Sequence, residues 1–216
     1  MEREGEGITS VKRQWTMELA AEDRRRIEES IRQKYSKVAT SPDGHFRYPT
    51  GLAALETLDY AGEMIRKLST SILSSYCGVG NPFKLGTIDS GETILDVGCG
   101  SGVDTLIAAL MVGSEGKVVG IDMSPEMIEQ ATENLMKTDI KNVIFQEASA
   151  EELPFPDESF GVVISNGVFN LIPDKMKALA EVFRVLKPSG RFMIADQILT
   201  GQLPEDTKAR IESWFR

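Results

Sequence analysis

Short apolar segments alternate with amphipathic segments along the second part of the chain, and this alternation restricts the possible folds most strongly. The segments with the composition of strands are 93–97, 117–122, 142–147, 161–166 and 191–199. The segments between them with helical spacing are 102–112, 124–137 and 174–187. Ser124 followed by Pro125 predicts the start of the second helix, and Pro188 follows the end of the third. Strands joined through helices pair in parallel, with helices on both faces. The sequence therefore predicts an α/β fold with a doubly wound, mostly parallel sheet.

The rest of the chain predicts a helical cap before this sheet and one further helix after it. A charged helix is expected over 16–38, and apolar residues recur near helical spacing over 52–68, with Gly62 as a weak point. We therefore divide the chain into an N-terminal helical cap, a main domain and the start of a C-terminal helix, at residues 1–74, 75–200 and 201–216. A sheet that ends at its fifth strand leaves an exposed edge, and such edges are usually covered or paired. We therefore expect a truncated chain that lacks its last strands.

Composition excludes several classes of protein. The chain has 216 residues, 41% of them hydrophobic, which suffices for one sizeable core. Its formal net charge of −9 opposes binding to nucleic acid. It has neither a run of about 18 apolar residues nor the apolar core of a signal peptide. Cys77 and Cys99 are its only cysteines, so no disulfide framework is predicted. We expect a cytoplasmic protein with a small-molecule partner, without nucleic-acid or membrane partners and without a metal site, and the oligomeric state stays open.

A glycine-rich turn between the first strand and its helix, in the segment ILDVGCGSGVD, predicts a nucleotide-type site. Gly98, Gly100 and Gly102 let the backbone approach a ligand, and the following helix directs free N–H groups toward it. Ligands of open parallel sheets bind beyond the carboxyl ends of the strands, where this turn lies. Asp122 ends the second strand twenty residues after Gly102, and its carboxylate can accept hydrogen bonds from both hydroxyls of a ribose.

Two nucleotide cofactors compete for this site. A dinucleotide site requires the spacing G-x-G-x-x-G, whereas the three glycines here are spaced by two throughout. Asp96 stands at the strand end just before the turn. Its carboxylate would repel a pyrophosphate and attract an α-ammonium group. Because S-adenosylmethionine carries that ammonium, these residues favour it over a nicotinamide dinucleotide.

These residues also carry a family resemblance. Asp96-x-Gly98-x-Gly100-x-Gly102 followed by Asp122 resembles the first two motifs of class I S-adenosylmethionine-dependent methyltransferases. EASAEELPFPDESFGVVISN resembles their third and fourth motifs, and LKPSGRFMIAD resembles their fifth-strand signature, so that the match covers about residues 75–200. The resemblance implies cofactor contacts along the strand ends: Cys99 in the turn, Met123 beside Asp122, Ser149 and Ala150 against the adenine, and Asn166 with Ser165 beside the methionine portion. Many relatives carry an Asp where Ser149 stands.

A narrower resemblance points to the arsenite methyltransferase group. The segments that carry it are CGVGNPF, GVDTLIAAL, VISNGVFNLIPDK, EVFRVLKPSG and ILTGQLPED. IRQKYSKVA resembles that group's cofactor-capping helix, which makes Tyr35 a candidate cofactor contact. The group holds soft trivalent arsenic with several cysteines. Cys77 matches one of them, Gly167 stands at the second position, and the third position lies just beyond Trp214, where the sequence stops.

The acceptor site is expected where the N-terminal part closes over the strand ends, with Cys77, His45 and Tyr48 as candidate contacts. His45 is the one side chain that is a base at neutral pH without a shifted pKa, and it is equally well a surface residue. The resemblance implies methyl transfer from S-adenosylmethionine to a small molecule, with a trivalent arsenical as one candidate acceptor. Two alternatives stay open: a C- or O-methyltransferase of small metabolites similar to the quinone-biosynthesis group, and a cofactor-binding protein without catalysis.

Overall fold

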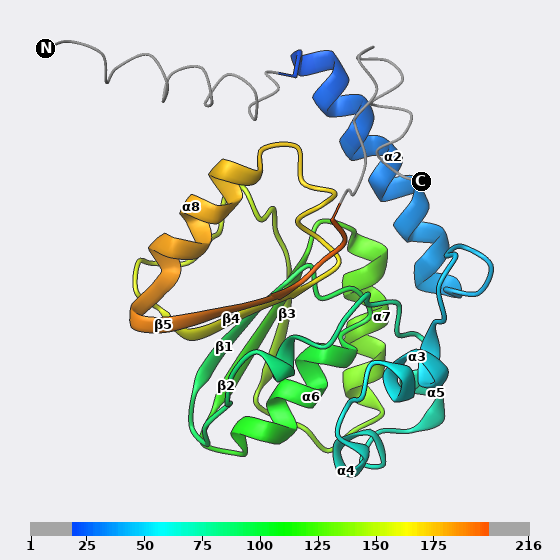
Figure 1. Cartoon of the computed structure of the whole chain (residues 1–216), viewed down its shortest axis with the longest axis vertical. Coiled ribbons are helices and arrows are strands. Elements are labelled where there is room, and N and C mark those ends of the chain that lie inside the picture. The colour runs from blue at the N-terminus through cyan, green and yellow to red at the C-terminus, as the bar shows by residue number, and fades with distance from the viewer. Residues whose placement is uncertain (1–18, 199–216) are drawn as a thin grey trace, which may run out of the picture.

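The computed structural model describes residues 19–198, which form a five-stranded sheet with helices on both faces (Figure 1). All neighbouring strands are parallel, in the order β3-β2-β1-β4-β5. The strands are β1 (Thr93–Val97), β2 (Lys117–Asp122), β3 (Val143–Glu147), β4 (Phe160–Asn166) and β5 (Leu186–Ala195). The predicted doubly wound α/β fold is therefore confirmed. Its strand order reverses at β1 and β4, the place where open α/β sheets bind ligands.

Alternate residues of each strand pack against opposite helix layers. Ile94 and Val162 pack with α6 (Val103–Val112), whereas Leu95 and Val163 pack with α8 (Lys175–Val185). The helix α7 (Pro125–Met136) lies on the α6 side against β2 and β3. Because both faces are covered, the central strands are apolar without alternation, as parallel sheets require. The short helix α6 is apolar almost all round because it is covered on its outer side as well.

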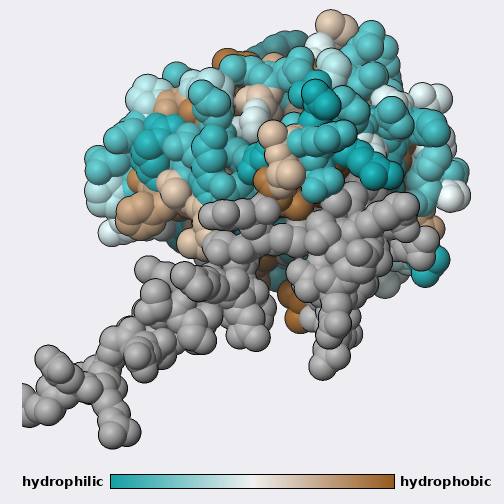
Figure 2. All heavy atoms as spheres, turned by 90° about the horizontal axis from the view of Figure 1, so that it is seen from above, coloured by the Kyte–Doolittle hydropathy of each residue, from teal (hydrophilic) through white to brown (hydrophobic). Residues whose placement is uncertain are grey.

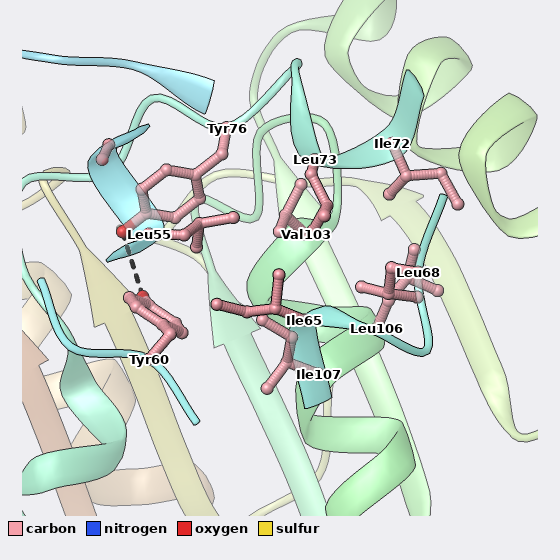
Figure 3. Close-up of a cluster of buried hydrophobic side chains, with 11 residues drawn as sticks. Leu55, Tyr60, Ile65, Leu68, Ile72, Leu73, Tyr76, Val103, Leu106 and Ile107 are labelled. Carbon is pink, nitrogen blue, oxygen red and sulfur yellow. Dashed lines mark hydrogen bonds between the residues drawn. The ribbon is translucent and has the colours of Figure 1, made fainter. Parts of the chain in front are cut away.

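The outer cover of α6 comes from the segment that the sequence predicted as one helical stretch over 52–68. The structure divides it into two short helices, α3 (Gly51–Thr57) and α4 (Gly62–Ile65), and a third, α5 (Thr70–Leu73), follows directly after it. Asp59 takes a left-handed φ of 61°, which no helix interior accepts, so the helix stops there. Leu55, Ile65 and Ile72 of these helices pack against Leu106 and Ile107 of α6 (Figure 3).

Two further boundaries differ from the prediction. The charged helix is α2 (Ala21–Thr40) rather than 16–38, and it stands beside the carboxyl ends of the strands (Figure 1). Strand β5 begins at Leu186, five residues before the predicted start, and its pairing with β4 shifts between Phe160 and Val162. The expected helix over 201–216 lies outside the described residues. A short 3₁₀ helix, η1 (Pro82–Lys84), precedes β1.

One face of the molecule is mostly polar where the structure describes it. Seen from above, it is largely hydrophilic with scattered apolar residues (Figure 2). Within residues 19–198, no helix combines the length and apolar character needed to cross a membrane. The free energy of folding therefore comes mainly from the two layers of apolar packing on the sheet.

Candidate functional site

A cavity of about 360 Å³ opens at the carboxyl ends of the strands, between the glycine-rich turn and helix α2. Its wall includes these residues of the predicted cofactor site: Tyr35, Asp96, Gly98, Cys99, Gly100, Asp122, Met123, Ser149, Ala150 and Asn166. Cys77, predicted for the acceptor, lies in the same wall. Among the residues that the structure describes, three predicted site residues do not line the cavity, namely Gly102, His45 and Tyr48. The fold thus brings segments from across the chain to one place.

The three glycines of the turn do different things. Gly98 and Gly100 line the cavity with φ of 73° and 52°. A Cβ on Gly98 would lie 2.2 Å from a methyl group of Val168, whereas one on Gly100 would meet nothing closer than 4.0 Å. A Cβ on Gly102 would lie 2.6 Å from the ring of Phe145. The missing side chain of Gly102 allows α6 to pack closely on the sheet, and its predicted contact with the cofactor stays a prediction.

Asp122 joins the turn to the end of β2. Its Oδ2 accepts a hydrogen bond from the backbone N–H of Gly100 at 3.0 Å, and its Oδ1 accepts one from the N–H of Ser124 at 2.9 Å. Burial raises the pKa of this carboxyl, and the backbone donors counteract the rise. Each carboxylate oxygen can accept a second bond. Asp122 is thus held rigidly with acceptor capacity left over.

Asp96 is buried behind the turn with 2% of its surface exposed. Its Oδ2 accepts a hydrogen bond from the Thr105 hydroxyl at 2.6 Å. Burial and then the nearby carboxylate of Asp104 raise its pKa well above the usual range. A cation in the cavity would oppose both effects, because it favours the ionised carboxylate.

Asp104 is a site residue that the sequence analysis missed. It lies in the first turn of α6, lines the cavity and is 7% exposed. Burial raises its pKa to about 6, although hydrogen bonds from Asn166 and Tyr60 counteract the rise. Acids are common in first turns, so the position alone drew no attention. The sequence could have indicated Asp104, because the neighbouring positions of this helix are apolar and an acid among them must be buried.

Helix α2 forms the outer wall of the cavity through Glu28, Ile31, Arg32 and Tyr35. Ile31 is buried and packs in one cluster with Met123 and Leu171. The guanidinium of Arg24 is paired with the buried carboxylate of Glu151, on the loop that follows Ser149 and Ala150. Apolar contact and a charge pair therefore hold α2 against the strand ends.

Aromatic side chains lie near Cys77, behind the cavity wall. Cys77 is half-buried, and its carbonyl accepts a hydrogen bond from the Tyr48 hydroxyl at 3.2 Å. Tyr48 stacks on Phe46 with ring centroids 5.0 Å apart, and the ammonium of Lys34 lies 4.9 Å from the Phe46 centroid. Burial, followed by the carboxylates of Asp122 and Asp104, raises the pKa of the Cys77 thiol to about 12, while Lys34 lowers it. Cys77 is therefore a neutral thiol near pH 7.

The other predicted acceptor contact is exposed. His45 lies in the turn before Phe46 and does not reach the cavity wall. Tyr48 is linked to the cavity wall by the hydrogen bond from its hydroxyl to the carbonyl of Cys77. Within residues 19–198, the histidine, cysteine and acidic side chains form no group of three or more that could hold a metal ion.

The cavity wall is strongly acidic. Its carboxyl groups are those of Glu28, Asp96, Asp104, Asp122, Glu147 and Glu151, against the single guanidinium of Arg32. S-adenosylmethionine carries a sulfonium and an ammonium against one carboxylate, so its charge complements this wall. The pyrophosphate of a dinucleotide would be repelled by it. Gly100 also leaves open space beside the turn. The residues present therefore fit S-adenosylmethionine.

Comparison with known proteins agrees with this site. A family model described as "Methyltransferase domain" matches residues 88–216. The chain is 36% identical over 204 residues to an arsenite methyltransferase of Halobacterium salinarum, which covers 88% of this chain and 52% of that protein. It is 40% identical over 114 residues to a demethylmenaquinone methyltransferase of Listeria welshimeri, covering 52% of this chain and 48% of the relative. The structure resembles that of an arsenic(III) S-adenosylmethionine methyltransferase from Chlamydomonas reinhardtii, with TM-score 0.56, 34% identity and coverage of 73% and 52%.

Fold, site and comparisons define a class I methyltransferase domain that uses S-adenosylmethionine as its cofactor. The chain belongs to this methyltransferase-domain family, and it is similar to the arsenite methyltransferases within it. It spans about half the length of the curated relatives that it matches.

Proposed function

We propose that this protein transfers the methyl group of S-adenosylmethionine to a small acceptor that binds at the Cys77 end of the cavity. The observation that carries the proposal is one continuous acidic cavity, whose wall runs from Asp122 and Gly100 to Cys77 and Gly167. It offers places for a cationic cofactor and for a neighbouring acceptor. Such proximity is the main requirement of methyl transfer, which is an in-line displacement.

The cofactor residues receive the following roles. Asp122 accepts hydrogen bonds from the ribose hydroxyls, and Asp96 faces the ammonium. Ser149 and Ala150 lie against the adenine. Gly98, Cys99, Gly100 and Met123 form the surface along the nucleoside, and Tyr35 covers it from α2. The cap of residues 1–74 closes over the cofactor, which the position of α2 in the cavity wall supports.

When bound, S-adenosylmethionine supplies an electrophilic methyl group on a positively charged sulfur. The protein's part is to align the acceptor with that sulfur and to exclude water. The apolar contacts of Ile31 with Met123 and Leu171 support this exclusion at the α2 side. An arsenic lone pair needs no base for the transfer, whereas an oxygen or carbon acceptor usually does.

A trivalent arsenical is the acceptor that we favour. The similarity to arsenite methyltransferases and the thiol of Cys77 in the cavity wall both support it. The neutral thiol can condense with an As–OH group to give an As–S bond and water, so the step needs no oxidant. With glycine at position 167, we expect this chain to bind arsenite weakly, because several thiols bound to one ion provide most of the affinity.

The glycine at position 167 supports a second candidate acceptor. An acceptor that does not require two thiols, such as a quinol methylated on carbon or oxygen, suits a cavity with Gly167 in its wall. The similarity to demethylmenaquinone methyltransferases over half of the chain agrees with this alternative.

Calorimetric titration tests the cofactor, with NAD as the matched comparison. We expect binding of S-adenosylmethionine and none of NAD, and Cys77→Ser should leave the affinity for S-adenosylmethionine unchanged. Methyl transfer to arsenite or to a demethylated quinol is then followed by mass spectrometry. Transfer to arsenite that is lost in Cys77→Ser assigns the arsenical, and transfer to the quinol assigns the alternative. Cofactor binding without transfer to any acceptor would overturn the proposed catalysis.

A further inference from the structure

The side-chain amide of Asn166, at the carboxyl end of β4, is fully occupied by the protein itself. Its Oδ1 accepts hydrogen bonds from the backbone N–H groups of Val79 and Gly80 at 2.9 and 3.0 Å. Its Nδ2 donates toward the Gly80 carbonyl at 2.8 Å, the Asp104 carboxylate at 2.9 Å and the Tyr76 hydroxyl at 3.0 Å. An amide has two lone pairs and two hydrogens. Both lone pairs are used, and the two hydrogens have more acceptors than they can serve.

This arrangement changes the role that the family resemblance implied for Asn166. The resemblance placed its segment beside the methionine portion of the cofactor, but its amide has no hydrogen-bonding capacity left for a ligand. What the amide holds instead is the segment that follows Cys77. Asn166 therefore links the end of a central strand to a loop about 90 residues earlier in the chain.

A second layer of buried polar groups supports this amide. The Tyr60 hydroxyl donates to Asp104 Oδ1 at 2.7 Å, and the Tyr76 hydroxyl donates to the Gly80 carbonyl at 2.9 Å. The two hydroxyl oxygens lie 3.0 Å apart and point toward one another (Figure 3). Tyr60, Tyr76 and Asp104 are all buried. We call Asn166, Asp104, Tyr60 and Tyr76 the Asn166 clamp. Its polar groups satisfy one another, as a buried network must.

The clamped segment has glycines where the clamp touches it. A Cβ on Gly78 would lie 2.4 Å from both the Asn166 amide nitrogen and the Tyr76 hydroxyl. A Cβ on Gly80 would lie 2.6 Å from the Cβ of Ala195, at the end of β5. Only residues without a side chain allow the backbone to come this close. The Cys77–Gly80 segment is thus pressed against the ends of β4 and β5.

We propose that Asn166 is a positioning residue which, with Asp104 and the two tyrosines, holds the Cys77–Gly80 segment in place as one wall of the acceptor site. The inference rests on the proposed function, because it takes the Cys77 end of the cavity as the acceptor end. It assigns no cofactor contact to the Asn166 amide. Loosening the clamp should therefore disturb the acceptor end and leave the cofactor end intact.

The test compares Asn166→Ala with Asn142→Ala. Asn142 is a matched control, because its amide also donates to two backbone carbonyls, those of Gly113 and Gly116, at the opposite edge of the sheet. The readout is the rate at which iodoacetamide alkylates Cys77, resolved by mass spectrometry, with Cys99 as the internal reference. We expect Asn166→Ala to increase the Cys77 rate by about tenfold, because the lost hydrogen bonds favour local opening of the segment. Asn142→Ala should leave it unchanged.

Two further measurements separate positioning from ligand binding. In Asn166→Ala, the Kd for S-adenosylmethionine should change by less than about threefold, because no hydrogen bond to the cofactor is lost. With arsenite as the probe, its KM should rise while the KM for S-adenosylmethionine stays the same. Tyr76→Phe, which removes one hydroxyl from the clamp, should increase the Cys77 rate by a smaller factor, and it carries the test if Asn166→Ala does not fold.

An unchanged Cys77 rate in a folded clamp variant overturns the proposal. So does a loss of cofactor affinity as large as that in Asp122→Ala, because Asn166 would then be a cofactor ligand. If the unmodified protein does not bind S-adenosylmethionine, the proposed function fails, but the alkylation rates still show whether the clamp exists.

Discussion

At the scale of single residues, the glycines of the glycine-rich turn differ in what surrounds them. Gly98 and Gly102 leave no room for a side chain, since their Cβ positions lie against Val168 and Phe145. Gly100 borders open space and lines the cavity. A φ of 52° favours glycine at this position, and no neighbouring side chain excludes a Cβ there.

Substitution by alanine should reveal this difference. Gly100→Ala should cost about 1 kcal/mol of stability, from the left-handed backbone alone, and should weaken binding of S-adenosylmethionine. Gly98→Ala should cost about 2–4 kcal/mol, because the same backbone strain adds to the collision with Val168. Urea unfolding gives both stabilities, and calorimetry gives the affinities. Equal costs at the two positions would contradict the geometry.

Asp122 provides the direct test of the ribose contact. Asp122→Ala should weaken binding of S-adenosylmethionine by about 1.5–3 kcal/mol, the range for hydrogen bonds to a charged group. Glu126→Ala is the control, because Glu126 is an exposed acid in the following turn and does not line the cavity. Unchanged affinity in a folded Asp122→Ala protein would remove Asp122 from the site.

The buried carboxyl of Asp104 should make stability depend on pH. Its pKa is raised from 3.8 to about 6 by burial, so that between these values the folded protein binds more protons than the unfolded chain. The free energy of unfolding therefore falls as pH rises through this window, by about 1 kcal/mol between pH 5 and 7 from this group alone. Asp104→Asn should flatten this part of the profile in urea titrations without cofactor. An identical profile in Asp104→Asn would show that the group does not titrate there.

At the scale of elements, α2 is the part of the cavity wall that is attached to the rest of the fold by few buried residues. Its buried residues are few, Ile27, Ile31 and Val38, and most of its surface is charged and exposed. The pair of Arg24 with Glu151 joins it to the loop near Ala150. A helix that rests on so few contacts opens more readily than the strands beneath it.

Removing an apolar contact of α2 should therefore change how long the cofactor stays bound. Ile31→Ala should leave a gap against Met123 and Leu171, increase hydrogen exchange in α2 and speed release of S-adenosylmethionine by about tenfold or more. Arg25→Ala in the same helix should have no such effect, since Arg25 is exposed and its ion pair with Glu29 spans 4.0 Å. Stopped-flow displacement measures the release rate. Equal rates in the two variants would show that α2 does not retain the cofactor.

At the scale of the whole molecule, the charge of the protein agrees in sign with the charge of the cavity. The chain carries a net charge of −9, and carboxyl groups dominate the cavity wall. Both features attract the positively charged cofactor, and both weaken at high salt because ions screen charges over about 10 Å at 0.1 M ionic strength.

Salt should therefore distinguish the cofactor from its demethylated product. S-adenosylhomocysteine lacks the transferred methyl group and with it the sulfonium charge, and the rest of the molecule is the same. Raising sodium chloride from about 0.05 to 0.5 M should weaken binding of S-adenosylmethionine more than binding of the product. Calorimetry at both salt concentrations measures the ratio of the Kd for S-adenosylmethionine to the Kd for S-adenosylhomocysteine. A ratio that does not change with salt would mean that the acidic wall does not sense the sulfonium.

Sequence alone determined the order of the elements and the place of the site. Periodicity and the cap at Ser124 act within a few residues, so they can be interpreted locally. Parallel strands bring their carboxyl ends to one edge, which is why Asp96, Asp122 and Asn166 could be predicted to meet. Residues 58–61 were harder to predict, because the break at Asp59 depends on how α3 and α4 pack on α6.

The tertiary structure alone decided which buried polar groups pair and which glycines of the turn line the cavity. Asp104, Tyr60 and Asn166 lie in segments separated by 44 to 106 residues. No local pattern signals their contact, because a buried donor pairs with whichever acceptor the packing brings near. For the same reason Gly102 belongs to the helix–sheet contact and His45 to the surface. The direction of a Cα–Cβ bond relative to other segments exists only once those segments are packed together.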